Sequence, residues 1–358
     1  MNILFLDQFN GLGGGQQCLR DLVTGIVERG WTAHVGLPSG GPLAHDIARA
    51  GGIVHELQLQ QYSNGRKSLK QMMRFASEAP RLAIEIRSLI RSHRIDLVYV
   101  NGPRLLPAAA MAADKLVFHS HSLLTPRYST LLAGISLRKC RATVIASSQF
   151  VAEPLRSHLP PERLQIIYNG VRDYGSVGKR PVAKCPAIGV IGRIASEKGQ
   201  LDFVHAARDI PSCRFVICGD PQHSGGSYLS EVRDAADGLP IEFLDWQSDL
   251  GPVLRGLDVV VVPSMSLDAT PRVILEAFSA GVPVVAYPSG GLTELIENGT
   301  NGILTSESTP PSLASAITEL LADPQKMQRL AHNARRCYLS RFTVERFRKD
   351  VVAVLERI

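Results

Sequence analysis

The sequence has no long apolar run and no cysteine spacing typical of a metal site. Residues 105–113 are the longest apolar candidate, far short of the roughly 18 to 20 residues of a membrane-spanning helix. The six cysteines form no C-x-x-C pair, and the amino terminus lacks a signal-peptide pattern. We therefore expect a chain that does not cross a bilayer, needs no disulfide or structural metal, and works in a reducing cytoplasm.

The net positive charge of the chain comes from its first half. Residues 1–175 carry 20 Lys/Arg and 12 Asp/Glu, a net of 20 − 12 = +8, whereas residues 176–358 carry 19 and 21, a net of 19 − 21 = −2. The 358 residues are 45% hydrophobic and 20% charged, which excludes a disordered or fibrous protein. This length suits two domains.

Short apolar runs alternate with segments of helical periodicity along the whole chain. The strand-like runs lie at 2–6, 32–37, 52–57, 96–100, 115–119, 142–146 and 165–168, and again at 187–191, 214–218, 241–244, 258–262 and 283–286. Strands that are apolar throughout indicate sheets covered on both faces. The expected fold class is therefore α/β, with two doubly wound, Rossmann-like parallel sheets.

A stretch rich in glycine, proline and charge at 169–184 interrupts this alternation and suits a linker. We expect an amino-terminal domain over residues 1–175 and a second domain over 176–340. Residues 341–358 are expected to form a terminal helix. In such folds ligands bind at the carboxyl ends of the strands and in the cleft between domains.

Glycines 11, 13, 14 and 15 lie between the first strand and its helix. Backbone without side chains lets amides approach an anion beside a helix N-terminus. The dinucleotide fingerprint would place its last glycine at Gln16, and no acidic residue ends the second strand. An NAD site and a purely structural turn are both alternatives to a phosphate site here.

Two cations lie in the loop from Gly192 to Gly199, after the first strand of the second domain. Arg193 and Lys198 are five residues apart near a helix N-terminus, where they can bind a diphosphate without a metal ion. The alternative is a solvated charged loop.

Two carboxylates, Asp268 and Glu276, follow a later strand with seven residues between them. One can accept hydrogen bonds from sugar hydroxyls and the other from a ribose. A helix cap is the plainer explanation for either residue alone. The loop 289–294, with Gly290 and Gly291, offers further backbone amides or is a simple turn.

The order of these motifs resembles the retaining glycosyltransferases of the GT-B fold, specifically family 4. The resemblance covers essentially the whole chain. It implies two domains facing across a cleft, with the acceptor bound by the first domain and the nucleotide sugar by the second. It also implies that a final helix, for which residues 343–358 are suited, crosses back to the first domain.

The resemblance implies roles for individual residues. Arg193 and Lys198 would hold the donor diphosphate, Asp268 the donor sugar, and Glu276 the ribose hydroxyls. Gly14 and Gly15 would bring backbone amides to the donor. The full set expected to bind the donor is Gly14, Gly15, Gly192, Arg193, Lys198, Gly219, Asp268, Thr270, Arg272 and Glu276.

The family also has a histidine at the end of a first-domain strand that contacts the donor sugar. His119 is favoured for this role by its position, and His121 is the alternative. The expected catalytic residues are His119, Asp268, Arg193 and Lys198. No Asp-x-Asp signature occurs in the sequence, so we expect no metal and no cofactor, with the leaving group neutralised by cations and helix amides.

The expected activity is transfer of a sugar from a nucleoside-diphosphate sugar, with UDP favoured over GDP, to a hydroxyl of a glycan or lipid-linked acceptor. Cell-surface polysaccharide or glycolipid synthesis is the expected setting. Two alternatives stay open, and Asp268 in place of the family's usual Glu supports only the second of them. These are a sugar-nucleotide isomerase or phosphorylase, and a catalytically idle nucleotide-sugar-binding homologue.

Residues 66–94 carry eight Lys/Arg and two acidic residues, with apolar residues at near-helical spacing. A basic amphipathic helix can lie on an anionic membrane, which suggests a peripheral location on its inner face. A core-packed helix with a solvated basic face is the alternative. No recognisable nucleic-acid-binding module accompanies the charge, so no nucleic-acid partner is expected.

Overall fold

The structure, a computed structural model, describes residues 1–59, 69–125, 127–176, 178, 184–221, 226–265 and 268–358. For residues 69–76 and 226 it describes the backbone only. The chain divides into two compact units. Unit 1 consists of residues 1–169 and 344–358, and unit 2 of residues 170–343.

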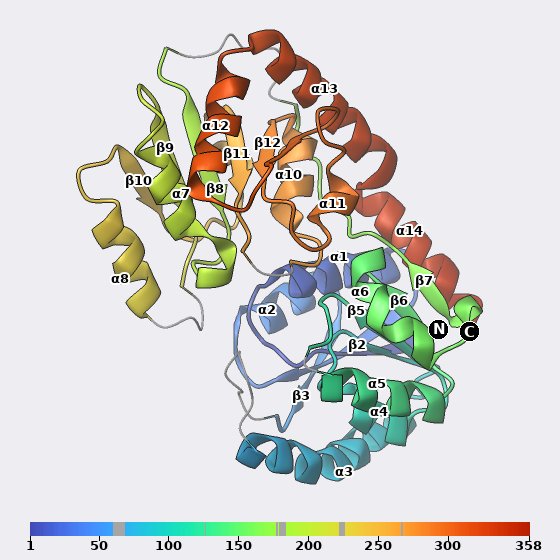
Figure 1. Cartoon of the computed structure of the whole chain (residues 1–358). Helices are drawn as coiled ribbons and strands as arrows, with labels where there is room; N and C mark the ends of the chain where they lie inside the picture. Colours follow the sequence, from blue (N-terminus) through green and yellow to red (C-terminus); the bar gives the residue numbers. More distant parts are fainter. Residues whose placement is uncertain (60–68, 126, 177, 179–183, 222–225, 266–267) are drawn as a thin grey trace. The chain divides into compact units, whose positions relative to one another are not determined.

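Unit 1 is built on a seven-stranded parallel sheet of order β3-β2-β1-β4-β5-β6-β7 (Figure 1). Its strands are β1 (Asn2–Leu6), β2 (Thr32–Pro38), β3 (Ile53–Leu57), β4 (Leu97–Val100), β5 (Leu116–Ser120), β6 (Thr143–Ala146) and β7 (Leu164–Ile166). Its helices are α1 (Gly14–Glu28), α2 (Pro42–Arg49), α3 (Leu69–Ser92), α4 (Leu106–Ala112), α5 (Arg127–Lys139), α6 (Gln149–Ala152) and α14 (Val344–Leu355), with 3-10 turns at Glu153–His158 and Pro161–Arg163.

Alternate residues of each central strand enter different cores. Ile3 and Phe5 of β1 pack with α1, α2 and α14, whereas Leu4 and Leu6 pack with α3, α4 and α5. All four side chains are fully buried. The continuous apolar strands thus reflect a sheet with helices on both faces, as expected for a doubly wound fold.

Unit 2 repeats this architecture with six parallel strands in the order β10-β9-β8-β11-β12-β13. The strands are β8 (Ala187–Ile191), β9 (Arg214–Cys218), β10 (Ile241–Leu244), β11 (Val259–Val262), β12 (Val284–Ala286) and β13 (Ile303–Leu304). The helices are α7 (Gln200–Ala207), α8 (Gly226–Ala235), α9 (Gly251–Gly256), α10 (Arg272–Ala280), α11 (Leu292–Leu295), α12 (Pro310–Leu321) and α13 (Pro324–Arg341), with a 3-10 turn at Ser196–Lys198. The predicted α/β class with two parallel sheets is confirmed.

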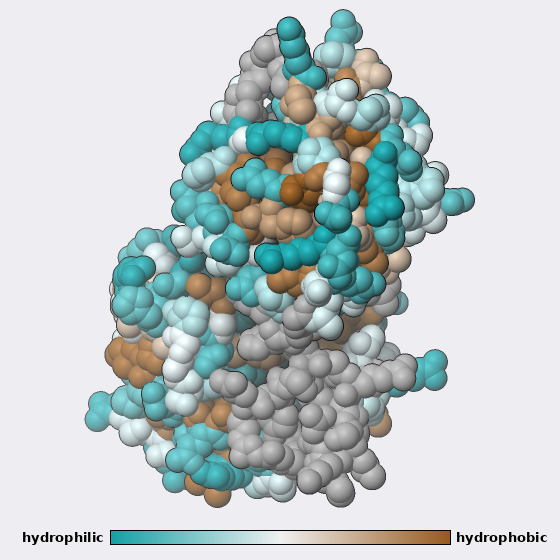
Figure 2. Space-filling view, turned by 90° about the vertical axis from the view of Figure 1, so that its left-hand side faces the viewer, coloured by the Kyte–Doolittle hydropathy of each residue, from teal (hydrophilic) through white to brown (hydrophobic). Residues whose placement is uncertain are grey.

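The edge strand β10 lies at one side of unit 2, next to β9. Its side chains Ile241 and Phe243 are only half-buried, and they pack against the core together with Tyr228 of α8. Figure 2 shows this side of unit 2, where hydrophobic atoms lie within a border of hydrophilic ones. The sheet is therefore less completely covered at this edge than at β8 and β11, which are almost entirely buried.

The boundary between the units lies at residue 170 rather than at the expected residue 175. The reason is that Val171 pairs with Thr343 in a β-bridge, and its amide donates to the Phe342 carbonyl at 2.9 Å. Asp173 is held in unit 2 by an ion pair with Arg335. Much of the stretch expected to be a linker is thus bound to unit 2; residues 177 and 179–183 of it lie outside the described residues.

The chain returns to unit 1 at Val344, where α14 begins, and not at residue 341, because α13 continues to Arg341 within unit 2. Phe347 and Val351 of α14 are buried in the core that α1 covers. Figure 1 shows α14 beside α1, at opposite ends of the colour scale. The last helix is therefore an integral part of unit 1.

Among the described residues, none of the helices is both long enough and apolar enough to span a membrane. In each unit the parallel strands end at the same edge of the sheet. The loops after β1, β4 and β5 therefore meet at one edge of unit 1, and the loops after β8, β9 and β11 at one edge of unit 2.

Candidate functional site

The carboxyl edge of the unit 2 sheet is assembled by close approaches of backbone at glycines. A Cβ atom at Gly219 would lie 1.9 Å from the Gly192 carbonyl oxygen, and one at Gly199 would lie 1.9 Å from the Pro263 carbonyl oxygen. Gly199 also has a φ of 71°, which glycine adopts without strain. Any side chain at these positions would push apart the loops that follow β8, β9 and β11.

The two cations of the loop after β8 each contact a carboxylate. Arg193 pairs with Glu197 one turn away, and Lys198 pairs with Asp268 in the loop after β11. The Arg193 backbone carbonyl accepts a hydrogen bond from the Gln200 side-chain Nε2 atom at 2.9 Å, which holds the loop against α7. These cations therefore belong to a structured loop, with side chains that remain about 30% exposed.

Asp268 is held by two side chains that come from different parts of the edge. In addition to Lys198, the Ser264 hydroxyl donates to its Oδ2 atom at 3.1 Å, and its carbonyl accepts from the Gly291 amide at 2.8 Å. The predicted lysine, aspartate and glycine loop are thus brought together. Residues 266 and 267 of the same motif lie outside the described residues.

Glu276 lies on the buried side of α10 and is only 4% exposed. The Arg272 Nε atom lies 3.7 Å from its Oε1 atom, and the Arg272 side chain also donates to the Gly170 carbonyl at 3.1 Å. Burial, followed by the charge of Glu276, raises the pKa of Tyr174. Thr270, at 8% exposed, lies just before this helix.

In unit 1 the glycine loop leads directly into α1. Gly13 is the N-cap residue, no side chain caps the helix, and its first turn carries no acidic residue. The amides at the start of the 15-residue helix are therefore available to an anion. A Cβ atom at Gly15 would lie 3.3 Å from the ring of His121, so that glycine admits the histidine.

Asp7, at the end of β1, is the centre of a buried polar network. Its carboxylate accepts hydrogen bonds from the Asn101 side chain at 2.6 Å, from the Gln16 side chain at 3.0 Å and from the Phe9 amide at 2.9 Å. Asn101 in turn contacts His121 Nε2 through its Oδ1 atom at 2.8 Å. Burial raises the pKa of Asp7 to about 6, although the hydrogen bonds act in the opposite direction.

The two candidate histidines have different surroundings. His119 is 1% exposed, and its Nδ1 atom lies 2.6 Å from the Tyr99 hydroxyl. Burial, followed by the charge of His121, lowers its pKa well below the usual value. His121 is half-buried beside Gly15 and is therefore more exposed than His119.

Asp7, Asn101, Gln16 and Tyr99 also belong to these networks, although no sequence motif assigned them to the site. Asp7 and Asn101 each follow directly after a strand, and β1 and β4 are neighbours in the sheet. A polar residue immediately after two adjacent buried strands was therefore the signal that could have found them.

Two parallel-sheet α/β units, with glycine loops and helix N-termini at their carboxyl edges, define a protein of the GT-B class. The amino-terminal part matches the family model described as Glycosyltransferase Family 4 over residues 12–173. The carboxyl-terminal part matches the model described as Glycosyl transferases group 1 over residues 179–337. The chain therefore belongs to the family 4, group 1 glycosyltransferases.

Similar proteins include solved structures that align over the whole length of the chain. The crystal structure of Anabaena Alr3699/HepE in complex with UDP and glucose has a TM-score of 0.85 and 28% identity, covering 100% of each chain. The alpha-D-kanosaminyltransferase of Streptomyces kanamyceticus is 34% identical over 160 residues, 42% of this chain and 40% of the relative. The D-inositol 3-phosphate glycosyltransferase of Mycobacterium sp. (strain KMS) is 32% identical over 206 residues, 52% of this chain and 47% of the relative. The matched segments thus span less than half of these curated relatives.

The raised pKa of Asp7 makes a prediction for stability. Since the pKa is about 6 in the folded chain and 3.8 for an aspartate in water, protonation stabilises the folded state. The free energy of unfolding of unit 1 should fall by about 3 kcal/mol as the pH rises from about 4 to about 7. Replacing Asp7 with Asn should remove this pH dependence. The measurement is urea unfolding followed by Trp31 fluorescence, with Trp246 of unit 2 replaced by Phe.

The matched control is Asp114→Asn, which removes an exposed carboxylate from the same unit. Relative to the parent chain, Asp7→Asn should gain stability steadily across this pH range, and Asp114→Asn should not. Parallel pH profiles for all three chains would show that Asp7 titrates at its ordinary value.

Proposed function

We propose that the protein transfers a sugar from a nucleoside-diphosphate sugar to a hydroxyl group of a glycan or lipid-linked acceptor. Unit 2 binds the donor, and unit 1 binds the acceptor. The observation that carries this proposal is the pair of cations, Arg193 and Lys198, in a structured loop at a carboxyl edge beside Asp268. The likeness to HepE, solved with UDP and with glucose, supports UDP rather than GDP as the nucleotide.

In this proposal, donor binding changes the partners of the two cations at the carboxyl edge of the unit 2 sheet. The diphosphate takes the place of Asp268 beside Lys198 and of Glu197 beside Arg193, because a diphosphate carries more charge than one carboxylate. Asp268 is then available to accept hydrogen bonds from the donor sugar. Glu276, already beside Arg272, accepts hydrogen bonds from the ribose. Gly192, Gly219, Thr270 and Arg272 shape the remainder of the donor site.

In unit 1, the N-terminus of α1 and His121 are the groups proposed to act on the donor. The amides of Gly14 and Gly15 offer donors to developing negative charge, which is the most effective way to stabilise a leaving group. The Asn101 side chain is hydrogen-bonded both to His121 Nε2 and to the Asp7 carboxylate. A buried polar network therefore holds the His121 ring in its orientation. His119 has the role of a buried support bonded to Tyr99.

The reaction is proposed to retain the anomeric configuration and to need no metal ion. Support for the second point comes from the two cations and the uncapped helix N-terminus, which supply positive charge where a divalent ion would otherwise act. A double displacement requires a nucleophilic carboxylate at the reacting face, and this proposal assigns no carboxylate to that position. We therefore propose a same-face attack, in which the donor phosphate accepts the proton of the acceptor hydroxyl.

A membrane surface is the proposed location of the acceptor. The helices α3, α4 and α5 lie side by side on one face of unit 1 (Figure 1). They expose the apolar side chains Ile84 (68%), Leu131 (54%) and Ile135 (52%). Arg81 and Arg91 of α3 are also exposed. Such a mixture of basic and apolar groups favours anionic lipid; Arg66 and Lys67, and the side chains of Lys70 and Arg74, lie outside what the structure describes.

Donor binding is tested by thermal unfolding with UDP, GDP, ADP and NAD. UDP at about 100 times its dissociation constant should add about 2.7 kcal/mol of stability, a shift of about 5 °C or more. In Arg193→Ala the loss of a charged hydrogen bond should weaken UDP binding about 10-fold to 100-fold. The control Arg336→Ala removes an exposed positive charge from α13 and should bind UDP normally. A shift with NAD alone would point to a redox enzyme instead.

The transfer reaction itself separates the proposal from its alternatives. With a UDP-sugar and a hydroxyl acceptor, NMR of the product should show the donor's anomeric configuration, and excess EDTA should change the rate by less than about twofold. A rate that EDTA abolishes and Mg²⁺ restores would contradict the metal-free mechanism. Conversion of the donor without an acceptor would indicate an isomerase, and binding without turnover an idle homologue.

Membrane binding is tested by co-sedimentation with vesicles of phosphatidylglycerol and phosphatidylcholine at low salt. Each basic side chain near an anionic surface contributes about 1 kcal/mol, so Arg81→Ala together with Arg91→Ala should lower partitioning about 30-fold. The same number of charges is removed in the control by Arg336→Ala and Arg208→Ala, on unit 2. Equal sedimentation of both variants, or none by the parent chain, would refute a lipid surface over α3.

A further inference from the structure

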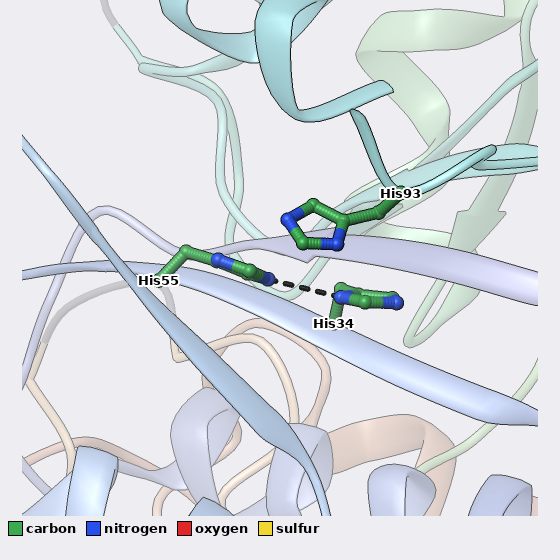
Figure 3. Close-up of side chains that lie close together, drawn as sticks. All are labelled: His34, His55 and His93. Atoms are coloured by element: carbon green, nitrogen blue, oxygen red, sulfur yellow. Dashed lines mark hydrogen bonds between the residues drawn. The ribbon is translucent and has the colours of Figure 1, made fainter. Parts of the chain in front are cut away.

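Three histidines from distant parts of the sequence meet on the α3 face of the unit 1 sheet. His34 lies on β2, His55 on β3, and His93 directly after α3. Figure 3 shows their rings turned toward one another, with His34 Nδ1 and His55 Nε2 2.9 Å apart. The ring centroid of His93 lies 4.7 Å from those of both other histidines.

The backbone holds each of these residues in place. In the parallel pairing of β2 with β3, His34 lies opposite Ile53 and Gly36 opposite His55, so the two rings leave the same face of the sheet. Just beyond the end of α3 at Ser92, Arg94 has a φ of 49° and the Ile95 amide donates to the Ile90 carbonyl, which closes the helix. The Asn2 side chain then donates to the carbonyl oxygens of His93 and Arg94, each at 3.2 Å.

We propose that His34, His55 and His93 bind a transition-metal ion such as Zn²⁺. One nitrogen from each ring lies within 4.8 Å of the others. In a tetrahedral zinc site, with zinc–nitrogen distances of about 2.0 to 2.1 Å, ligand nitrogens are about 3.3 Å apart. Binding would require the three nitrogens, now within 4.8 Å of one another, to adopt that spacing, with a water molecule as the fourth ligand.

The protonation state of the cluster suits a metal ligand set. Burial, followed by the charges of the other two histidines, lowers the pKa of His34. The pKa of His55 is lowered by burial and then by His93. Neutral imidazole is the form that coordinates Zn²⁺, Ni²⁺, Co²⁺ and Cu²⁺. A bound cation would accept the lone pairs of three ring nitrogens. Without an ion, the hydrogen bond between His34 and His55 engages only one nitrogen lone pair.

The site is separate from the carboxyl edge where the donor and acceptor are proposed to react. His34 is four residues before Pro38, the last residue of β2, which corresponds to about 13 Å along the strand. His93 lies just before β4 begins. The ion would therefore link the edge strand β3 to the end of α3 and would stabilise unit 1 without touching the substrates.

The experiment uses the full chain without a histidine tag and with Cys185, an exposed thiol, replaced by Ser. After treatment with a chelator and its removal, the chain is dialysed against micromolar Zn²⁺ and its metal content is measured by mass spectrometry. The expected result is one ion per chain. Co²⁺ in place of Zn²⁺ should give visible d–d bands without a thiolate charge-transfer band, since the proposed ligands are nitrogens.

His93→Gln and His55→Gln should each weaken Zn²⁺ binding at least 100-fold, because each removes one of three ligands. His332→Ala, which removes an exposed histidine from α13, should bind as the parent chain does. Circular dichroism shows which variants fold, and one folded glutamine variant is sufficient for the test. Zinc should also raise the thermal midpoint of the parent chain by about 5 °C at 100 times the dissociation constant, and not that of the variants.

Two results would overturn the proposal. One is binding by the parent chain that is no tighter than millimolar, the affinity of scattered surface histidines. The other is binding that both glutamine variants retain. Because the readouts are metal content and stability, they are independent of glycosyl transfer.

Discussion

The parallel direction of the strands is the constraint on which the rest of the structure depends. All strands of a sheet end at one edge, so residues that follow different strands become neighbours whatever their separation in sequence. Asp7, Asn101 and His121 follow β1, β4 and β5 and form one network. In unit 2 the same constraint brings Lys198 and Asp268 together across 70 positions. Because helices cover both faces of each sheet, functional polar groups lie at these carboxyl edges.

Much of the fold could be predicted from the sequence, because largely apolar runs of four to six residues leave little choice but a strand in a covered sheet. The predicted runs all correspond to strands, whereas β13, which has only two residues, Ile303 and Leu304, carries no such signal. The boundary between the units at residue 170 could not be predicted from the sequence either. It depends on Val171 pairing with Phe342 and Thr343, a contact between segments 172 positions apart that local composition does not encode.

The candidate site was predictable only in part, for a related physical reason. Glycines and cations at Gly192, Arg193 and Lys198 carry their chemistry in their residue types, so a motif can locate them. The difference between His119 and His121 is one of burial, because His119 lies within the buried strand β5 and His121 lies just beyond its end. Likewise, nothing in the spacing of His34, His55 and His93 indicates a cluster. Only the register of β2 with β3 and the end of α3 unite them.

The return of the chain to unit 1 at Val344 has a consequence for the order of folding during synthesis. Unit 2 is continuous in sequence, whereas the core of unit 1 includes Phe347, Val351 and Leu355 from the last helix. Since domains generally fold as units while the chain emerges, unit 2 has all of its residues before unit 1 does. Unit 1 is thus begun before unit 2 and completed after it, with the apolar surface that α14 covers left open until residues 344–355 leave the ribosome.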